Sequence, residues 1–246
     1  MIPWPTHFWA SSPERFAVAA AVTLGFAALA RVLRGVNSSG AVAGGLVCLL
    51  LFVGAGPAGF VALVALFVMT WVSTRLGRSR KVALGVAERR EGRSAWQVLA
   101  NLIAASLGSV FYGATGNRGW LVAAVAALCE AAIDTVASEI GQAGRAEARL
   151  ITTWQRVAAG TDGGITAPGC MAGAASGMSL ALLSSAGGLL PVSQIWIAVS
   201  AGFFGMLFDS FLGATVQSRG LISNQAVNFF ATLAAAMLAY AILQLG

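Results

Sequence analysis

The chain has 246 residues, of which 58% are hydrophobic and only 10% are charged, and its mean hydropathy is +0.80. A soluble domain carries about 25% charged residues, so this composition excludes an ordinary water-soluble domain and favours the lipid bilayer as the solvent. The net charge of +6 does not indicate nucleic-acid binding, because the basic residues follow the loops of a membrane protein, and we expect no nucleic-acid partner.

Eight apolar segments follow one another along the chain. Each is close to the ~17–25 residues with which a helix crosses a bilayer, and the alternating pattern of a membrane β-barrel is absent. The sequence therefore predicts an all-α, polytopic integral membrane protein with seven or eight transmembrane helices, in one domain over residues 1–246. The segments lie at 15–33, 38–54, 57–75, 95–113, 117–137, 166–186, 192–213 and 222–244.

The stretch 1–14, before the first apolar segment, lacks the basic start and the continuous apolar centre of a cleavable signal peptide. Trp4, Phe8 and Trp9 are instead typical of aromatic side chains that anchor a chain at the membrane surface. We interpret this stretch as an interfacial segment.

The basic residues are distributed asymmetrically. With eight spans, all of the 15 Lys and Arg residues except Arg15 and Arg118 fall on one side of the membrane. The positive-inside rule makes this side the cytoplasm and places both termini outside. The main cytoplasmic loops are then those near 75–94 and 139–165, and we expect the protein in the inner (plasma) membrane of a bacterium.

Most acidic residues lie on the same side, although acids contribute little to orientation. In the fifth span, Glu130, Asp134 and Ser138 are spaced four residues apart and share one helix face, with Glu139 on the neighbouring stripe. Ionisable groups cost about 2.5–3.5 kcal/mol at the centre of a span and mark functional sites. The alternative is that Asp134 and Glu139 merely end the helix among the lipid headgroups.

A glycine-rich stretch, GTDGGIT, precedes the sixth span and contains Thr161, Asp162, Gly163 and Gly164. Glycines let backbone N–H groups turn toward an anion, and the start of a helix adds its positive end. A phosphate can rest here while Asp162 holds a metal ion. The alternative is an ordinary turn that is capped by Asp or Thr.

The end of the seventh span is polar as well. Asp209 interrupts an apolar run, Ser210 and Gln217 lie on the adjoining face, and Asn224 and Asn228 follow four residues apart at the start of the eighth span. A buried aspartate needs a partner. We expect these side chains to line a polar site, unless the amides only join neighbouring helices.

Arg93, Gln97 and Asn101 are also spaced four residues apart, downstream of a basic group that includes Lys81. Exposed arginines at such positions can simply contact anionic lipid headgroups. This alternative is weaker for Arg93, because Gln97 and Asn101 continue its face into the membrane.

Carboxylates without a histidine or cysteine cluster favour a hard cation such as Mg²⁺, and arginines with a glycine-rich loop suit phosphate oxygens. The only histidine, His7, lies on the other side of the membrane, which excludes a Ser–His–Asp triad and a His-ligated zinc ion here. The pattern favours metal-assisted transfer of a phosphoryl or nucleotidyl group to a lipid. The candidate metal ligands are Glu130, Asp134, Asp162 and Asp209, and the candidate substrate- and nucleotide-binding residues are Lys81, Arg93, Gln97, Asn101, Thr161, Gly163, Gly164, Ser210, Gln217, Asn224 and Asn228.

Five motifs carry a resemblance to a known family, the transmembrane protein 19-like family, which was long labelled a domain of unknown function and includes the plant phytyl-phosphate kinase. The resemblance covers roughly residues 30–240. More distantly, the spacing of Asp134, Ser138 and Gly141 is similar to a pattern of dolichol and phytol kinases and of other CTP-using lipid enzymes. The motifs are GRSAWQVLANL (92–102), DTVASEIG (134–141), GTDGGIT (160–166), FDSFLGATVQ (208–217) and NQAVNF (224–229).

This resemblance implies a Mg²⁺-dependent kinase that uses CTP or another nucleoside triphosphate to convert a prenyl monophosphate, such as phytyl or geranylgeranyl monophosphate, into the diphosphate. It implies that Asp134, Ser138, Glu139 and Asp209 are catalytic, and that the loop 162–164 faces phosphate. We expect Asn in the family at the position of Asp162, and the Asp found here suits metal binding.

The leading hypothesis is therefore a prenyl-phosphate kinase whose lipid tail lies between helices with small residues, for example Gly40, Gly44 and Gly45. Two alternatives stay open: a CTP-dependent cytidylyltransferase, in which the lipid phosphate attacks the α-phosphate, and a transporter of ions or anionic solutes that uses the same carboxylates. The expected partners are the lipid bilayer, a prenyl phosphate lipid and a nucleoside triphosphate, and a homodimer is left open.

Overall fold

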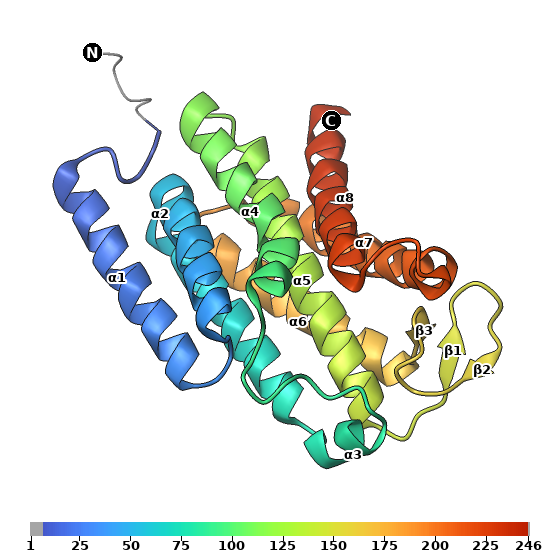
Figure 1. The fold of residues 1–246 in the computed structure, drawn as a ribbon. Helices are drawn as coiled ribbons and strands as arrows, with labels where there is room; N and C mark the ends of the chain where they lie inside the picture. The colour runs from blue at the N-terminus through green and yellow to red at the C-terminus, as the bar shows by residue number, and fades with distance from the viewer. Residues whose placement is uncertain (1–6, 246) are drawn as a thin grey trace.

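A computed structural model describes residues 7–245, so Trp4 and the rest of 1–6 in the predicted interfacial segment lie outside the described residues. Helices make up almost all of the structure (Figure 1), and the all-α prediction is confirmed. Short 3₁₀ turns lie at Val192–Gln194 and Gln217–Arg219. The helices are α1 (Pro13–Val32), α2 (Ser38–Arg75), α3 (Arg78–Ala83), α4 (Ala95–Thr115), α5 (Gly119–Ala143), α6 (Ala167–Ala186), α7 (Ile195–Thr215) and α8 (Asn224–Leu245).

Seven of the described helices are long and apolar enough to cross a membrane, which confirms a polytopic integral membrane protein. Local capping explains where they begin. The side chain of Ser12 accepts the N–H of Arg15 (3.3 Å) ahead of α1, and Pro13 fits the first turn because its missing N–H is not needed there. Helix α5 continues to Ala143, beyond the predicted end of its span at 137.

The longest helix, α2, has 38 residues and would measure about 57 Å if it were straight, far more than the ~30 Å thickness of the hydrocarbon core. It is broken at Gly56, which has a φ of 70° and precedes Pro57. The end of the second arm lies beside the connection that precedes the first arm, because the carbonyl oxygen of Leu33, at the end of α1, accepts hydrogen bonds from Trp71 (3.1 Å) and Arg75 (2.7 Å). Helix α2 is therefore a hairpin (Figure 1), and its arms are the second and third of the eight predicted spans.

Helix α5 is the centre of the bundle and packs against α2, α4, α6, α7 and α8. Its apolar window is 83% buried, against 17% for the peripheral helix α1. Glycines allow this close packing: a Cβ atom on Gly173 of α6 would lie 2.7 Å from the carbonyl oxygen of Ile133, and one on Gly202 of α7 would lie 2.9 Å from the backbone nitrogen of Glu130. Polar side chains on α5 consequently face protein rather than lipid.

The connection between α5 and α6 contains a small antiparallel sheet at the edge of the bundle (Figure 1). Its strands are β1 (Ala148–Leu150), β2 (Arg156–Val157) and β3 (Gly164–Ile165), in the order β2–β1–β3. Arg149 of β1 pairs with Arg156 and with Ile165. Neither this sheet nor α3 was predicted, because both belong to short polar stretches without a periodic apolar pattern.

The sheet, α3 and the loop 84–94 lie at one end of the bundle, which we call the basic end (Figure 1). The two arginines assigned to the other side of the membrane lie at the opposite end. Arg118 donates a hydrogen bond to the carbonyl of Gly188 in the α6–α7 connection (2.7 Å), and Arg15 lies 5.6 Å from the ring centre of Trp9. These two arginines thus lie away from the basic end, and the assignment of the two ends to the two sides of the membrane stays a prediction.

A buried ion pair ties α3 to α5 at the basic end. Lys81 is 1% exposed, and its ammonium group donates to Glu139 (2.5 Å) and to the carbonyl oxygens of Ser73 (3.1 Å) and Thr74 (2.8 Å) in the last turn of α2. All three donors of the ammonium group are thus used within the protein. The pair joins α2, α3 and α5.

Lys81→Met is therefore expected to destabilise the protein by about 3–5 kcal/mol, because it leaves a buried carboxylate without its partner. Thermal unfolding of the detergent-solubilised protein measures the loss. The matched control is Arg156→Met, which removes an ion pair with Glu147 (2.8 Å) whose two side chains are 69% and 53% exposed and which contributes about 0–1 kcal/mol. Equal melting temperatures for the two variants would contradict a stabilising role for Lys81.

Candidate active site

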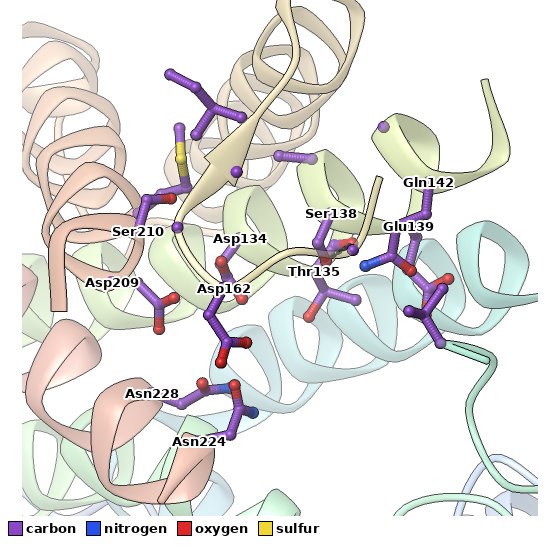
Figure 2. Close-up of a pocket in the computed structure, with 18 of the residues that line it drawn as sticks. Asp134, Thr135, Ser138, Glu139, Gln142, Asp162, Asp209, Ser210, Asn224 and Asn228 are labelled. Atoms are coloured by element: carbon purple, nitrogen blue, oxygen red, sulfur yellow. Dashed lines mark hydrogen bonds between the residues drawn. The ribbon is translucent and has the colours of Figure 1, made fainter. Parts of the chain in front are cut away.

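A cavity of about 340 Å³ opens at the basic end, between α4, α5, α7, α8 and the loop that carries β3 (Figure 2). It collects most of the residues that the sequence singles out, from five separate segments of the chain. Of the predicted residues, those that line it are Arg93, Gln97, Asn101, Asp134, Ser138, Glu139, Thr161, Asp162, Gly163, Gly164, Asp209, Ser210, Asn224 and Asn228.

Three aspartates from three segments share this cavity. Figure 2 shows the carboxylates of Asp134, Asp162 and Asp209 around one space, with Asn224 and Asn228 beside it. Asp134 and Asp209 are half-buried in their helices, whereas Asp162 is exposed at the mouth. The predicted convergence of acids from α5, the glycine-rich loop and α7 is thus present in the fold.

The glycine-rich loop rests directly on the end of α7. Gly163 has a φ of 75°, and a Cβ atom there would lie 2.6 Å from the carbonyl oxygen of Ser210 and 2.7 Å from the backbone nitrogen of Ala214. On α7, a Cβ atom on Gly213 would lie 2.9 Å from the nitrogen of Gly163. Only glycine fits this backbone-to-backbone contact. It holds the neighbouring Asp162 beside α7.

The sheet fixes the other side of the loop. The carbonyl oxygen of Gly163 accepts a hydrogen bond from Ile151 (3.0 Å), and the N–H of Gly164 donates to the carbonyl oxygen of Thr161 (2.8 Å). At the start of α6, the side chain of Thr166 caps the helix by accepting the N–H of Gly169 (3.1 Å). The loop is therefore an ordered part of the site, although it has no long strand or helix of its own.

Helix α8 supports α7 through an amide. In the orientation that gives both ends of the Asn228 amide suitable partners, its nitrogen donates to Oδ2 of Asp209 (3.3 Å) and to the carbonyl oxygen of Asn224 (2.8 Å). Asn228 thus orients the Asp209 carboxylate toward the cavity. This residue both joins α8 to α7 and lines the cavity, so it fits both interpretations of the asparagines.

The wall toward α4 contains one cation. Arg93 precedes the helix, is half-buried, and donates to the hydroxyl of Thr135 (3.4 Å). Both ends of the Gln97 amide are hydrogen-bonded within the protein. Its oxygen accepts the N–H of Ser94 in a capping box (2.9 Å), and its nitrogen donates to Glu88 (3.0 Å). Arg93 is therefore the side chain of this wall that is free to meet an anion.

Most of the charged side chains that line the cavity are acidic. Among the described residues that line it, five are carboxylates and one, Arg93, is basic. Glu139 is paired with Lys81, and the other four carboxylates exceed the single arginine, so the lining keeps a net negative charge that favours a bound cation over a nucleotide or phosphate without one. The five acids are Glu88, Asp134, Glu139, Asp162 and Asp209.

The donor set fits Mg²⁺, with one correction to the predicted geometry. Within residues 7–245, no group of three or more His, Cys, Asp or Glu side chains is close enough to enclose a metal ion, so the three aspartates do not form a complete protein cage. Mg²⁺ characteristically keeps several waters and binds through one or two carboxylates plus substrate phosphates. Carboxylate and amide oxygens around an open space suit that mode of binding.

Three predicted residues lie away from the cavity lining. Lys81 is buried in its ion pair with Glu139, and Gln217 lies in the turn after α7. Glu130 is 1% exposed one turn deeper in α5, and its oxygens have no hydrogen-bond partner among the described residues. Several lining residues were not predicted, among them Glu88, Gln142 and Gln225.

Comparisons with known proteins agree with the observed fold. The family model described as "Integral membrane protein DUF92" matches residues 21–236. An uncharacterized membrane protein of Synechocystis is 33% identical over 76% of this chain and 74% of its own length. Two proteins of Arabidopsis thaliana also match: Protein VTE6, chloroplastic, at 30% identity over 80% of this chain and 62% of its own length, and Protein PGR, at 32% over 77% and 75%. No solved structure matches.

Proposed function

This chain belongs to the DUF92 family of integral membrane proteins, and we propose that it is a kinase that transfers a phosphoryl group from a nucleoside triphosphate to a prenyl monophosphate. The observation that carries the proposal is the acidic cavity with a single arginine at the basic end of the bundle. Such a cavity suits a nucleotide with its divalent cation at the boundary between water and lipid. The resemblance to a family that includes the plant phytyl-phosphate kinase supports the prenyl substrate and CTP as the donor.

In this reaction, an oxygen of the lipid phosphate forms a bond to the γ-phosphorus, and the bond from that phosphorus to the bridging oxygen of the nucleotide breaks. The products are a prenyl diphosphate and a nucleoside diphosphate. A phosphate monoester is largely dianionic at neutral pH, because its second pKa is about 6. The nucleophile thus needs no general base, in keeping with a cavity lined by acids.

One or two of the carboxylates of Asp134, Asp162 and Asp209 would hold Mg²⁺, and Asn228 would orient Asp209. The ion, when bound, supplies positive charge to the phosphate oxygens of the nucleotide. Arg93 offsets the charge that develops on the transferred phosphoryl group. The glycine-rich loop would position Asp162 at the mouth of the cavity, because the sheet and α7 fix this loop from both sides, whereas the N–H of Gly164 is already used by the carbonyl oxygen of Thr161.

Product analysis tests the proposal. The purified protein is incubated with Mg²⁺, a panel of nucleoside triphosphates and several prenyl monophosphates, and the products are identified by mass. We expect a prenyl diphosphate, no product after removal of the metal by a chelator, and recovery on addition of Mg²⁺. A CDP-linked lipid with release of pyrophosphate would instead identify a cytidylyltransferase. Absence of any phosphorylated or nucleotidylated lipid would overturn the assignment to an enzyme.

We also propose, from the distribution of basic residues, on which side of the membrane the phosphoryl transfer takes place. The basic end carries 13 of the 15 Lys and Arg residues, all except Arg15 and Arg118, and the positive-inside rule favours the cytoplasm for it. Nucleoside triphosphates are available there. Labelling of an introduced surface cysteine, such as Arg149→Cys on the exposed sheet, by a membrane-impermeant reagent in intact cells and in inverted vesicles checks the orientation.

A further inference from the structure

A second cavity, of about 410 Å³, adjoins the first. It lies between α1, the two arms of α2 and α4, and its volume is within the ~300–1,000 Å³ that small-molecule sites occupy. The two cavities share one wall, made of Glu88, Arg93, Gln97 and Asn101. A ligand in the second cavity therefore lies next to whatever occupies the acidic one.

The part of the second cavity within the bundle is apolar. Phe26 of α1, Leu63 of α2 and Leu102 of α4 line it, and the ring of Phe26 meets the ring of Phe67 edge-on at 5.4 Å. Gly44 of α2 also faces this space, since a Cβ atom there would contact only Val98, at 3.9 Å. The side chains of these residues are apolar, so this part of the cavity suits a hydrocarbon chain.

The mouth of the same cavity is strongly basic. Six arginines line it against one acid, Glu88, and none of the six forms an ion pair within residues 7–245. The hydrogen bonds of Arg75 and Arg78 go to the backbone carbonyls of Leu33, Trp71 and Glu88. Such a gathering of like charges is stabilised by an anion. The arginines are Arg34, Arg75, Arg78, Arg89, Arg90 and Arg93.

We propose that the second cavity binds the phosphorylated acceptor lipid, with a single prenyl-type tail in the apolar part and its phosphate at the arginine-lined mouth. This inference rests on the proposed kinase function and assigns its two substrates to two adjoining cavities of opposite charge. Arg93 lies in the shared wall and reaches Thr135 of the acidic cavity (3.4 Å). The acceptor phosphate thus meets the nucleotide at this residue, and the Gln97–Glu88 hydrogen bond (3.0 Å) is part of the partition between the two ligands.

The position of α1 gives the tail a path from the bilayer. Helix α1 is one wall of the cavity, packs chiefly against α2, and has only 17% of its apolar window buried. A helix with so few buried contacts separates from its neighbour at low cost. The lipid enters sideways between α1 and α2, while the charged headgroup stays at the arginines.

Filling the apolar part tests this assignment. Gly44→Leu places a side chain into the space that the lipid tail would occupy. The cavity then loses contact with a couple of methylene groups of the tail, which corresponds to about tenfold weaker binding of the lipid. We expect the KM for geranylgeranyl monophosphate to rise about tenfold, while the KM for dimethylallyl monophosphate stays unchanged because its tail is short. The matched control is Gly25→Leu, on an open face of α1 that does not line the cavity.

A binding measurement without nucleotide separates this inference from the proposed function. A prenyl monophosphate with a photoreactive tail is expected to label peptides of α1, α2 and α4, and excess geranylgeranyl monophosphate should prevent the labelling. Labelling there without any phosphoryl transfer would refute the kinase and retain the lipid site. Phosphoryl transfer with labelling confined to α7 and α8 would retain the kinase and refute the lipid site. Equal competition by a two-chain phosphatidate would also refute it, because the arginines would then be a general headgroup surface.

Discussion

Asp134→Asn is expected to lower the rate of phosphoryl transfer by about a hundredfold to a thousandfold, the effect of removing one electrostatic contact to the transition state. The substitution keeps the size of the side chain and removes a negative charge from the space shared with Asp162 and Asp209 (Figure 2). Mg²⁺ affinity should fall with it, so the Mg²⁺ concentration that gives half-maximal activity rises. The backbone of α5 has no reason to change.

Purified variants are compared at saturating Mg²⁺ and nucleotide, with the elution volume in detergent and the melting temperature as checks of folding. The control is Glu147→Gln, which removes a carboxylate from the exposed sheet, where it pairs with Arg156 (2.8 Å) outside the cavity. We expect full activity for this variant. A folded Asp134→Asn protein with the turnover of the wild type would exclude Asp134 from the reaction.

Gly163→Ala is expected to reduce phosphoryl transfer by about a hundredfold, because two effects combine at this position. Its φ of 75° costs an L-residue about 1–2 kcal/mol, and the new Cβ atom would lie 2.6 Å from the carbonyl oxygen of Ser210. The loop must therefore lift from α7 and carry Asp162 away from Asp209. A displacement of about 1 Å in a catalytic group is enough for an effect of this size.

Gly220→Ala separates the two effects. Gly220 also has a positive φ, 71°, but nothing lies within 4 Å of a Cβ atom placed there. The conformational penalty is thus the same while the collision is absent, and we expect activity within about twofold of the wild type, since Gly220 is outside the cavity. Steady-state rates and melting temperatures of both variants distinguish a local effect on the loop from a general loss of stability. Comparable losses of activity in both would contradict the role given to the contact with α7.

The transmembrane helices could be predicted because their signal is strong and local. A run of apolar residues bounded by charges fixes a span to within a few positions, as for the segment 95–113, which forms α4 over Ala95–Thr115. The hairpin in α2 is also visible in the sequence, since Gly56 and Pro57 interrupt an apolar run too long for one crossing. Helix α3 and the sheet were missed because their few residues are positioned by contacts with α5 and α7 rather than by a local pattern.

The site could be predicted in part for a related reason. Carboxylates and amides are conspicuous in an apolar chain, so Asp134, Asp209 and Asn228 stand out, and the fold brings them around one cavity. Position along a span does not reveal which neighbour a side chain meets. Lys81 is therefore found in a buried ion pair rather than in the cavity lining, and Glu88, in a loop full of charges, gave no signal that separated it from a solvated acid.

The central position of α5 has a consequence for how the protein is made. This helix leaves the ribosome with Glu130 and Asp134 before the three helices that later surround it, and at the centre of a span such a charge costs about 2.5–3.5 kcal/mol. Until α6, α7 and α8 have been made, α2 and α4 are the neighbours that can cover these side chains. A chain that ended after α5 would leave both carboxylates without the helices that cover them, so a domain boundary cannot be drawn inside this bundle.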